Sequence, residues 1–287
     1  TLTLSNGLKI PQMAFGTWKN EDPHECIDSV KTAILKGLTH IDCARVYANE
    51  HLVGKGIALA GVERKDLFLT SKLRNSAHGY ENVRKEVLAT LSDLQTDYLD
   101  LYLIHWPVVQ GHGDTWAKDN LDTWRAFEEL YKEGILRSIG VSNFSIPHLE
   151  NLLTHAQIKP MVNQILIHPG VLRREDMDFC RKHQIQLAGY SPLAPLKTIA
   201  RETFFQAMCA KYQKTPAQIL LRFVIDLQAI SLTKSIKEAR IQENMNIFDF
   251  SLQEADMRAL LNWSHKDFTI QDNMTERPPQ KLDALLK

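Results

Sequence analysis

The sequence contains no long uninterrupted hydrophobic run and no excess of charge of either sign. Its longest apolar stretch, residues 219–230, is broken by Arg222 and Asp226, which excludes a membrane-spanning helix. Lysine plus arginine and aspartate plus glutamate each number 34, so the formal net charge is zero. Binding to nucleic acid or an anionic membrane through a general basic field requires an excess of positive charge. We therefore predict neither kind of partner.

Cysteine is also scarce, and the four cysteines lie far apart in the sequence. Cys26, Cys43, Cys180 and Cys209 show no C-x-x-C spacing, and no H-E-x-x-H motif occurs. This pattern is typical neither of a disulfide framework nor of a zinc site, so no metal is predicted. The first ten residues lack the apolar segment of a signal peptide. We expect a cytoplasmic protein.

What the sequence does contain is a regular alternation of strand-like apolar runs with segments of helical period. The predicted strands lie at 13–18, 39–44, 67–72, 98–106, 135–143, 161–169, 185–192 and 229–235. The predicted helices follow them at 23–36, 49–60, 80–94, 121–132, 146–155, 173–182, 201–227 and 237–245. Eight β-then-α units without a linker between them predict a closed α/β fold, the (β/α)8 TIM barrel, formed by a single domain over residues 1–287.

A doubly wound open sheet is the alternative fold. It is disfavoured because no Gly-x-Gly-x-x-Gly motif follows a predicted strand: Gly54 and Gly56 lie in a helical segment, and Leu59 fills the third place. Three segments lie outside the repeat. An N-terminal β-hairpin is predicted around the turn S-N-G, and an extra C-terminal helix is predicted over 251–262. Residues 107–120 are predicted to form a long irregular loop after the fourth strand.

Polar side chains mark the carboxyl ends of the predicted strands. Parallel barrel strands are buried on both faces, so a polar residue at every strand end is unexpected unless it serves a function. All carboxyl ends converge on one face of a barrel, so these side chains are predicted to share one pocket. They are Thr17, Asp42, Lys72, His105, Ser142, Asn143, Gln164, Tyr190, Ser191, Lys234 and Ser235.

Three of these residues, together with Tyr47 in the loop after the second strand, form a set suited to protonating a carbonyl oxygen. A phenol titrates near about 10 and becomes a better acid when a neighbouring cation, here Lys72, favours its phenolate. A buried lysine needs a counter-charge, which Asp42 offers. His105 offers a hydrogen bond to an oxygen that develops negative charge. These four residues are the predicted catalytic group.

The attacking hydride must come from a cofactor, because no side chain delivers hydride. Ser142, Asn143 and Gln164 carry the hydroxyl and amide groups that a carboxamide would need. Tyr190 offers a flat face on which a ring can stack. These residues predict a nicotinamide site.

A phosphate site is predicted at the eighth strand. Lys234, Ser235 and Arg240 lie at a strand-to-helix junction, where two cations and a helix N-terminus favour an anion. The alternative is an ordinary exposed start of a basic helix, which for this segment alone is the slightly better interpretation.

The motifs taken together resemble the aldo-keto reductase superfamily, and they match in order and spacing through the whole chain. They are G-T-W at 16–18, H-I-D-x-A-x-x-Y-x-N-E at 40–50, T-S-K at 70–72, L-D-L-Y-L-I-H-W-P at 99–107, I-G-V-S-N-F at 139–144, N-Q-x-x-x-H-P at 163–169, Y-S-P-L at 190–193 and K-S-x-x-x-x-R-I-x-E-N at 234–244. The short tail after residue 263 resembles the compact branch that includes microbial 2,5-diketogluconate reductases and related aldehyde or ketone reductases.

The resemblance implies an NADPH-dependent oxidoreductase that reduces aldehyde or ketone carbonyls to alcohols on a (β/α)8 barrel. It implies that Tyr47 is the proton donor and that Lys72 lowers the pKa of Tyr47. It also implies that Asp42 pairs with Lys72 and that His105 orients the carbonyl oxygen. The family members of this branch are commonly monomers, so a monomer is expected.

The resemblance further implies a set of contacts to the cofactor. They come from Gly16, Thr17, Trp18, Ser142, Asn143, Gln164, Tyr190, Ser191, Leu193, Lys234, Ser235, Arg240, Glu243 and Asn244. Within this set, Lys234, Ser235 and Arg240 are assigned to the adenosine 2′-phosphate, so NADPH is favoured over NADH.

Four positions depart from the family pattern. Leu166 stands where glutamate is usual, Thr233 where proline is common, Ala194 where glycine is frequent, and Cys43 where a small hydroxyl residue is usual. None of the four belongs to the predicted catalytic group. Thr233 and Ala194 bear on the geometry of the cofactor loops.

The predicted substrate contacts are aromatic. Trp18, Trp106 and Trp116 are expected to form a wall around the carbonyl, with Tyr47 and His105 at the reacting oxygen. For Trp106, packing in the core or at the rim is the alternative. The expected substrates are small carbonyls, keto-sugars or keto-acids. The alternative function is an NADP(H)-binding regulatory or structural module with little turnover, and the complete catalytic group favours the enzyme.

Overall fold

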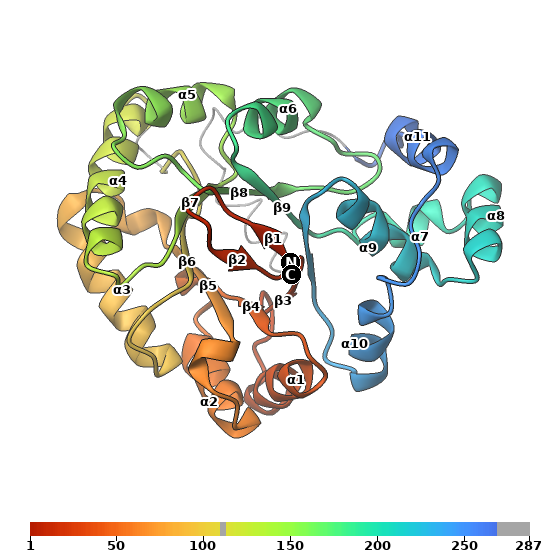
Figure 1. Cartoon of the computed structure of the whole chain (residues 1–287), viewed down its shortest axis with the longest axis horizontal. Coiled ribbons are helices and arrows are strands. Elements are labelled where there is room, and N and C mark those ends of the chain that lie inside the picture. Colours follow the sequence, from red (N-terminus) through yellow and green to blue (C-terminus); the bar gives the residue numbers. More distant parts are fainter. Residues whose placement is uncertain (110–112, 269–287) are drawn as a thin grey trace.

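Eight parallel strands close into a barrel in the computed structural model, which describes residues 1–109 and 113–268 (Figure 1). In chain order they are β3 (Met13–Gly16), β4 (His40–Asp42), β5 (Phe68–Leu73), β6 (Leu101–Ile104), β7 (Ile139–Ser142), β8 (Val162–Leu166), β9 (Gln186–Tyr190) and β10 (Ile230–Thr233). Each strand pairs with the next, and β10 closes the ring by pairing with both β9 and β3. The predicted (β/α)8 barrel is confirmed, and the open sheet is wrong.

Helices surround the barrel as an outer ring (Figure 1). They are α1 (Pro23–Leu35), α2 (Glu50–Ala60), α3 (Tyr80–Leu94), α4 (Trp116–Lys132), α5 (Ile146–His155), α6 (Arg174–Lys182), α7 (Leu196–Ile199), α8 (Thr203–Tyr212), α9 (Pro216–Asp226) and α10 (Glu238–Met245). The helix α1 shows the pattern expected of such a helix, because Cys26, Val30 and Ala33 are buried at i, i+4 and i+7. Within the described residues, no helix has the length and apolar character that a bilayer span requires.

Two additions complete the fold. The strands β1 (Leu2–Thr3) and β2 (Lys9–Ile10) pair in antiparallel fashion, and the hairpin that they form crosses the middle of the ring in Figure 1. Its turn uses Gly7 at φ 86°, in the left-handed region that favours glycine. The helix α11 (Glu254–Asn262) lies beyond the eighth unit. The predicted N-terminal hairpin and extra C-terminal helix are both confirmed.

The segment of helical period at 201–227 forms two helices, α8 and α9, and the helix start that the sequence Thr215-Pro216 predicts is confirmed. Pro216 is the first residue of α9, and Thr215 and Gln218 form a capping box in front of it. Proline lacks the backbone N–H that an interior helix residue donates, so a helix that enters this segment must end before Pro216.

The start of the helix predicted at 121–132 is wrong, because α4 begins at Trp116. The irregular loop predicted over 107–120 therefore cannot extend beyond residue 115, and its residues 110–112 lie outside the described residues. Oγ1 of Thr115 lies 2.7 Å from a carboxylate oxygen of Asp119, whose negative charge is favourable in the first turn of a helix.

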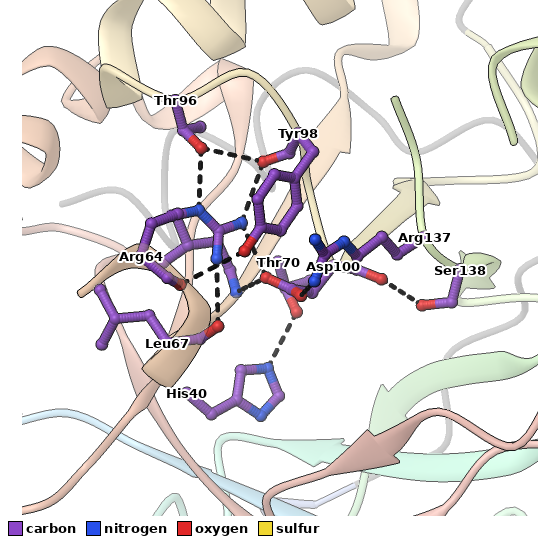
Figure 2. A network of polar contacts seen from close by, with 10 residues as sticks. His40, Arg64, Leu67, Thr70, Thr96, Tyr98, Asp100, Arg137 and Ser138 are labelled. Carbon is purple, nitrogen blue, oxygen red and sulfur yellow. Dashed lines mark hydrogen bonds and ion pairs between the residues drawn. The ribbon is translucent and has the colours of Figure 1, made fainter. Parts of the chain in front are cut away.

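A polar network ties the amino-terminal ends of the strands together (Figure 2). Asp100, directly before β6, accepts hydrogen bonds from the backbone N–H of Leu69 at 2.9 Å and from Nη2 of Arg64 at 2.7 Å. The ring of Tyr98 lies between two guanidinium groups, with Cζ of Arg64 at 3.8 Å and Cζ of Arg137 at 3.5 Å from its centroid. Because this end of a barrel faces away from the loops that carry function, the network serves stability.

His40, the first residue of β4, is buried at the same end of the barrel, and its Nε2 lies 2.8 Å from Oγ1 of Thr70 (Figure 2). Burial lowers the pKa of this imidazole from 6.5 to about 4, although Asp42 opposes the shift. As the pH falls below 6.5, the unfolded chain therefore takes up a proton before the folded protein does. Stability that is present above pH 6.5 is lost as the pH falls through this window.

We expect the free energy of unfolding to fall by about 3 kcal/mol on this account between neutral pH and about pH 4. Urea unfolding at a series of pH values measures the slope. His40→Gln removes this part of the pH dependence, whereas replacing the exposed His51 by glutamine leaves it unchanged. The same slope in wild type and His40→Gln would contradict the assignment.

Candidate active site

A buried ion pair lies at the centre of the candidate site. Lys72 of β5 has no exposed side-chain surface, and its Nζ lies 2.5 Å from Oδ1 of Asp42, the last residue of β4. The same Nζ donates a second hydrogen bond to the backbone carbonyl of Cys43 at 2.8 Å. An ammonium group without water needs such partners to remain charged. Pairing between β4 and β5 brings together two residues that are 30 positions apart in the sequence.

The phenol of Tyr47 and the imidazole of His105 lie beside this pair. Tyr47 ends the short 3-10 helix η1 (Arg45–Tyr47) that follows β4, and its ring centroid lies 5.3 Å from Nζ of Lys72. The rings of Tyr47 and His105 are 5.8 Å apart and nearly perpendicular, at 76°. The structure therefore brings the four predicted catalytic residues together at the carboxyl ends of β4, β5 and β6.

The pKa of Tyr47 differs from the expectation that Lys72 lowers it, because the net shift is upward. Burial raises the pKa of Tyr47 above its ordinary value of 10.0, and Lys72 opposes the rise without cancelling it. Burial also acts against the charge on Lys72, but Asp42 and Tyr47 outweigh it and raise the pKa of the ammonium. The site thus contains a protonated phenol beside a charged lysine at neutral pH, which is the arrangement that a proton donor requires.

The residues predicted to bind the nicotinamide are linked to the ion pair by hydrogen bonds. Nε2 of Gln164 donates to Oδ2 of Asp42 at 2.8 Å, and Oγ of Ser142 donates to the backbone carbonyl of Gln164 at 2.8 Å. Asn143 adopts a φ of 63° and accepts a hydrogen bond from the hydroxyl of Tyr190 at 2.8 Å. Residues from β7, β8 and β9 therefore form one connected surface next to Asp42.

The main chain of Asp42 is also held in place. Both the backbone N–H and Oγ1 of Thr17, directly after β3, donate to the carbonyl oxygen of Asp42, at 3.0 and 3.1 Å. Thr17 is fully buried, so no water competes for this oxygen. Of the predicted G-T-W contacts, Thr17 therefore contacts the catalytic strand directly, whereas the Trp18 ring lies 4.7 Å from Nζ of Lys19.

A cavity of about 680 Å³ lies between β10, α10 and the start of α1. Four cationic residues line it, and Glu25 and Glu243 add two carboxylates; the cations are Lys19, Lys234, Lys237 and Arg240. The other predicted cofactor residues that line it are Leu193, Ser235 and Asn244. Partial burial lowers the pKa of Lys234, although its side chain stays accessible to water. Four cations around a cavity of this size fit the phosphate-bearing half of a dinucleotide.

Two departures from the family pattern have a structural explanation. Oγ1 of Thr233, at the end of β10, accepts a hydrogen bond from Nδ2 of Asn244 at 3.0 Å, a contact that proline could not make. Thr233 therefore holds α10 against the strand. Cys43 contacts Lys72 through its backbone carbonyl, and its thiol is buried, so the contact does not depend on the side chain. Nothing in the structure explains Leu166 or Ala194.

Trp116 is not a loop residue. It is the first residue of α4, and its ring packs edge-on against His148 of α5 with centroids 4.6 Å apart. Trp106 follows His105 and is partly buried. The contact of these tryptophans with a substrate stays a prediction.

Sequence reasoning missed several residues of the cavity, among them the charged Lys19, Glu25 and Lys237. Lys19 has a left-handed φ of 57°, and its carbonyl accepts a hydrogen bond from Nζ of Lys234 at 2.7 Å. The available signal was its position directly after the G-T-W motif, at a strand exit.

The fold and the site together define a barrel protein equipped for acid–base chemistry at the carboxyl ends of its strands. The chain belongs to the aldo/keto reductase family, because the model of this family matches residues 12–262. It is therefore related to oxidoreductases along nearly the whole described chain.

Individual relatives are similar over most of their length. The chain is 46% identical over 258 residues to the glyoxal reductase of Bacillus subtilis (strain 168), and the match covers 90% of each protein. Among solved structures, the aldo/keto reductase of Brucella melitensis has a TM-score of 0.84 and 40% identity, covering 91% of this chain and 97% of that one. The aldo-keto reductase of Bombyx mori in complex with NADP has a TM-score of 0.86 and 32% identity, covering 94% of each chain.

Proposed function

We propose that the protein is an NADPH-dependent reductase of aldehyde and ketone carbonyls, acting on small carbonyls, keto-sugars or keto-acids. The observation that carries the proposal is the position of the Tyr47 phenol beside the buried ion pair of Lys72 and Asp42. Membership of the aldo/keto reductase family supports the same reaction class. The similarity to a glyoxal reductase and to an NADP complex supports the substrate class and the cofactor.

When bound, NADPH supplies the hydride that attacks the carbonyl carbon. Tyr47 donates its phenolic proton to the carbonyl oxygen, and Lys72 stabilises the phenolate that remains. His105 donates a hydrogen bond that orients the same oxygen. Asp42 keeps Lys72 charged and in position.

The residues that would hold the cofactor lie on the connected surface next to Asp42 and around the cavity beside β10. Ser142, Asn143 and Gln164 would bind the carboxamide, and Tyr190 would stack on the nicotinamide ring. Ser191 and Leu193 would lie along the pyrophosphate, and Gly16, Thr17 and Trp18 would make further contacts with the cofactor. The adenosine half would be bound by Lys234, Ser235, Arg240, Glu243 and Asn244.

A direct test follows the absorbance of NADPH while the purified protein is mixed with a panel of simple aldehydes, ketones and keto-sugars. We expect consumption of NADPH that depends on the carbonyl compound and is slower with NADH. Binding of NADPH without turnover on any carbonyl would instead support the regulatory or structural module.

Replacing Lys234 by alanine tests the phosphate site. We expect the dissociation constant of NADPH to rise by about 10- to 100-fold, because a charge-assisted hydrogen bond contributes roughly 1.5–3 kcal/mol. That of NADH, which lacks the 2′-phosphate, should change by less than about threefold. Fluorescence titration with both cofactors measures the difference, with the exposed Lys55→Ala as the control. Equal effects on both cofactors would show that Lys234 does not bind the 2′-phosphate.

A further inference from the structure

The turn that carries Tyr47 is only partly buried. None of the three residues of η1 is fully buried, and the side chain of Val46 is 51% exposed. The turn ends on Ala48 at φ 55°, a left-handed conformation that is unfavourable for alanine. Something outside the turn must therefore keep the phenol at its place beside Lys72.

The side chain of Arg45 connects the turn to the helices behind it. Its Nη1 lies 3.1 Å from Oε2 of Glu50, and the same atom forms an ion pair with Asp93 of α3. Its Nε lies 3.5 Å from a carboxylate oxygen of Glu86, also on α3. Arg45 thus reaches away from the catalytic pocket and into the gap between α2 and α3.

Glu50, the first residue of α2, is the buried centre of this arrangement. Its side chain is 1% exposed, and Oε1 accepts a hydrogen bond from Oγ of Ser71 at 2.5 Å. Oε2 accepts from Oγ1 of Thr90 at 3.1 Å as well as from Arg45. Ser71 directly precedes Lys72 in β5, and successive strand residues point to opposite faces. One carboxylate therefore contacts the Tyr47 turn through Arg45 and the Lys72 strand through Ser71.

We propose that Glu50 and Arg45 form a positioning pair that sets the distance between Tyr47 and Lys72. The inference rests on the proposed role of Tyr47 as the acid. Glu50 does not touch the reacting atoms; it acts through Arg45 on one side and Ser71 on the other. Burying a carboxylate is costly, and burial raises the pKa of Glu50 against the opposing effects of Ser71 and Arg45. A role in aligning Tyr47 with Lys72 explains why a carboxylate is buried at position 50.

The experiment compares Glu50→Gln with a matched variant at the opposite end of the barrel, Asp100→Asn. Both replace a buried carboxylate that pairs with an arginine, but Asp100 lies at the amino-terminal ends of the strands (Figure 2). Enzyme preloaded with NADPH is mixed with excess aldehyde, and the single-turnover rate is measured in H2O and in D2O. The dissociation constant of NADPH and the melting temperature are measured alongside.

For Glu50→Gln we expect the single-turnover rate to fall about 10- to 100-fold, because small misplacements of a catalytic group have effects of this size. The solvent isotope effect should increase, since proton transfer is the step that is slowed, while the dissociation constant of NADPH changes less than about twofold. Asp100→Asn should lower the melting temperature but leave the rate and the isotope effect of the folded protein unchanged. In a double-mutant cycle, the variant that combines Arg45→Gln with Glu50→Gln should lower the single-turnover rate little more than either single variant does.

The inference fails if wild type is active and Tyr47→Phe is inactive, yet Glu50→Gln keeps the wild-type rate and isotope effect. It also fails if Glu50→Gln and Asp100→Asn lose activity only in proportion to the unfolded fraction. If wild type reduces no carbonyl, it is instead the proposed function that fails, so the two outcomes are distinguishable.

Discussion

Tyr47→Phe is expected to reduce carbonyl turnover by about 10³-fold while leaving NADPH binding intact, because a positioned general acid contributes roughly 10²- to 10⁴-fold. The phenol is the group that holds a proton next to Lys72, and burial keeps that proton in place by raising the pKa of Tyr47. Phenylalanine retains the ring but has no proton to give. Steady-state assays with a good aldehyde substrate and fluorescence titration of NADPH measure the two properties separately.

The dependence of the wild-type reduction rate on pH is a second measurement of the same role of Tyr47. Because the pKa of Tyr47 is raised above 10.0, the acid is fully protonated across the neutral range. Reduction should therefore proceed with little pH dependence on this account until the pH exceeds 10 and the phenol loses its proton. Loss of NADPH binding in Tyr47→Phe, or retention of full turnover, would show that Tyr47 does not have this role.

Lys72→Met is expected to have the second large effect, on activity and stability together. The substitution removes the cation that stabilises the phenolate of Tyr47 and leaves Asp42 buried without its ion-pair partner. Breaking a buried pair from one side destabilises a protein by about 3–5 kcal/mol. Turnover should fall as strongly as in Tyr47→Phe, and any residual activity should persist to higher pH, because Lys72 no longer lowers the pKa of the phenol.

The double variant Lys72→Met with Asp42→Asn separates the two effects. Removing both charges avoids the unpaired carboxylate, so much of the lost stability should return, while turnover stays low. Urea unfolding and single-turnover assays on the same preparations provide the comparison. Recovery of turnover in the double variant would show that the loss in Lys72→Met came from misfolding and not from the missing cation.

Much of the site could be predicted from the sequence because a parallel barrel places all strand ends on one face. Asp42, Lys72 and Gln164 lie in buried strands and His105 directly follows one, and the order of the strands brings them near one another. The period of the apolar residues was sufficient to assign the alternation of strands and helices. Family motifs then assigned roles to residues such as Glu243, for which no pattern in the chain itself predicts a contact.

Other features could not be predicted, because they depend on contacts between distant segments. The packing of Trp116 on His148 joins two helices, and no periodicity in either one signals it. Glu50 has the sequence context of an ordinary acidic first residue of a helix, and only its contacts with Ser71 and Thr90 show that it is buried. Thr233 departs from the family pattern, and only the tertiary structure shows that its hydroxyl accepts a hydrogen bond from Asn244.

The sequence by itself determined the barrel, the side of the barrel that carries the site, and the residue types available there. These follow from local pattern and strand order, which are properties of the chain. The tertiary structure alone decided how the groups titrate and which of them are held in place. The pKa of Tyr47 depends on the balance between burial and the charge of Lys72, and both depend on every segment packed around the ring. This balance is a sum of contributions from all residues near Tyr47 in space, and the sequence alone does not identify those residues.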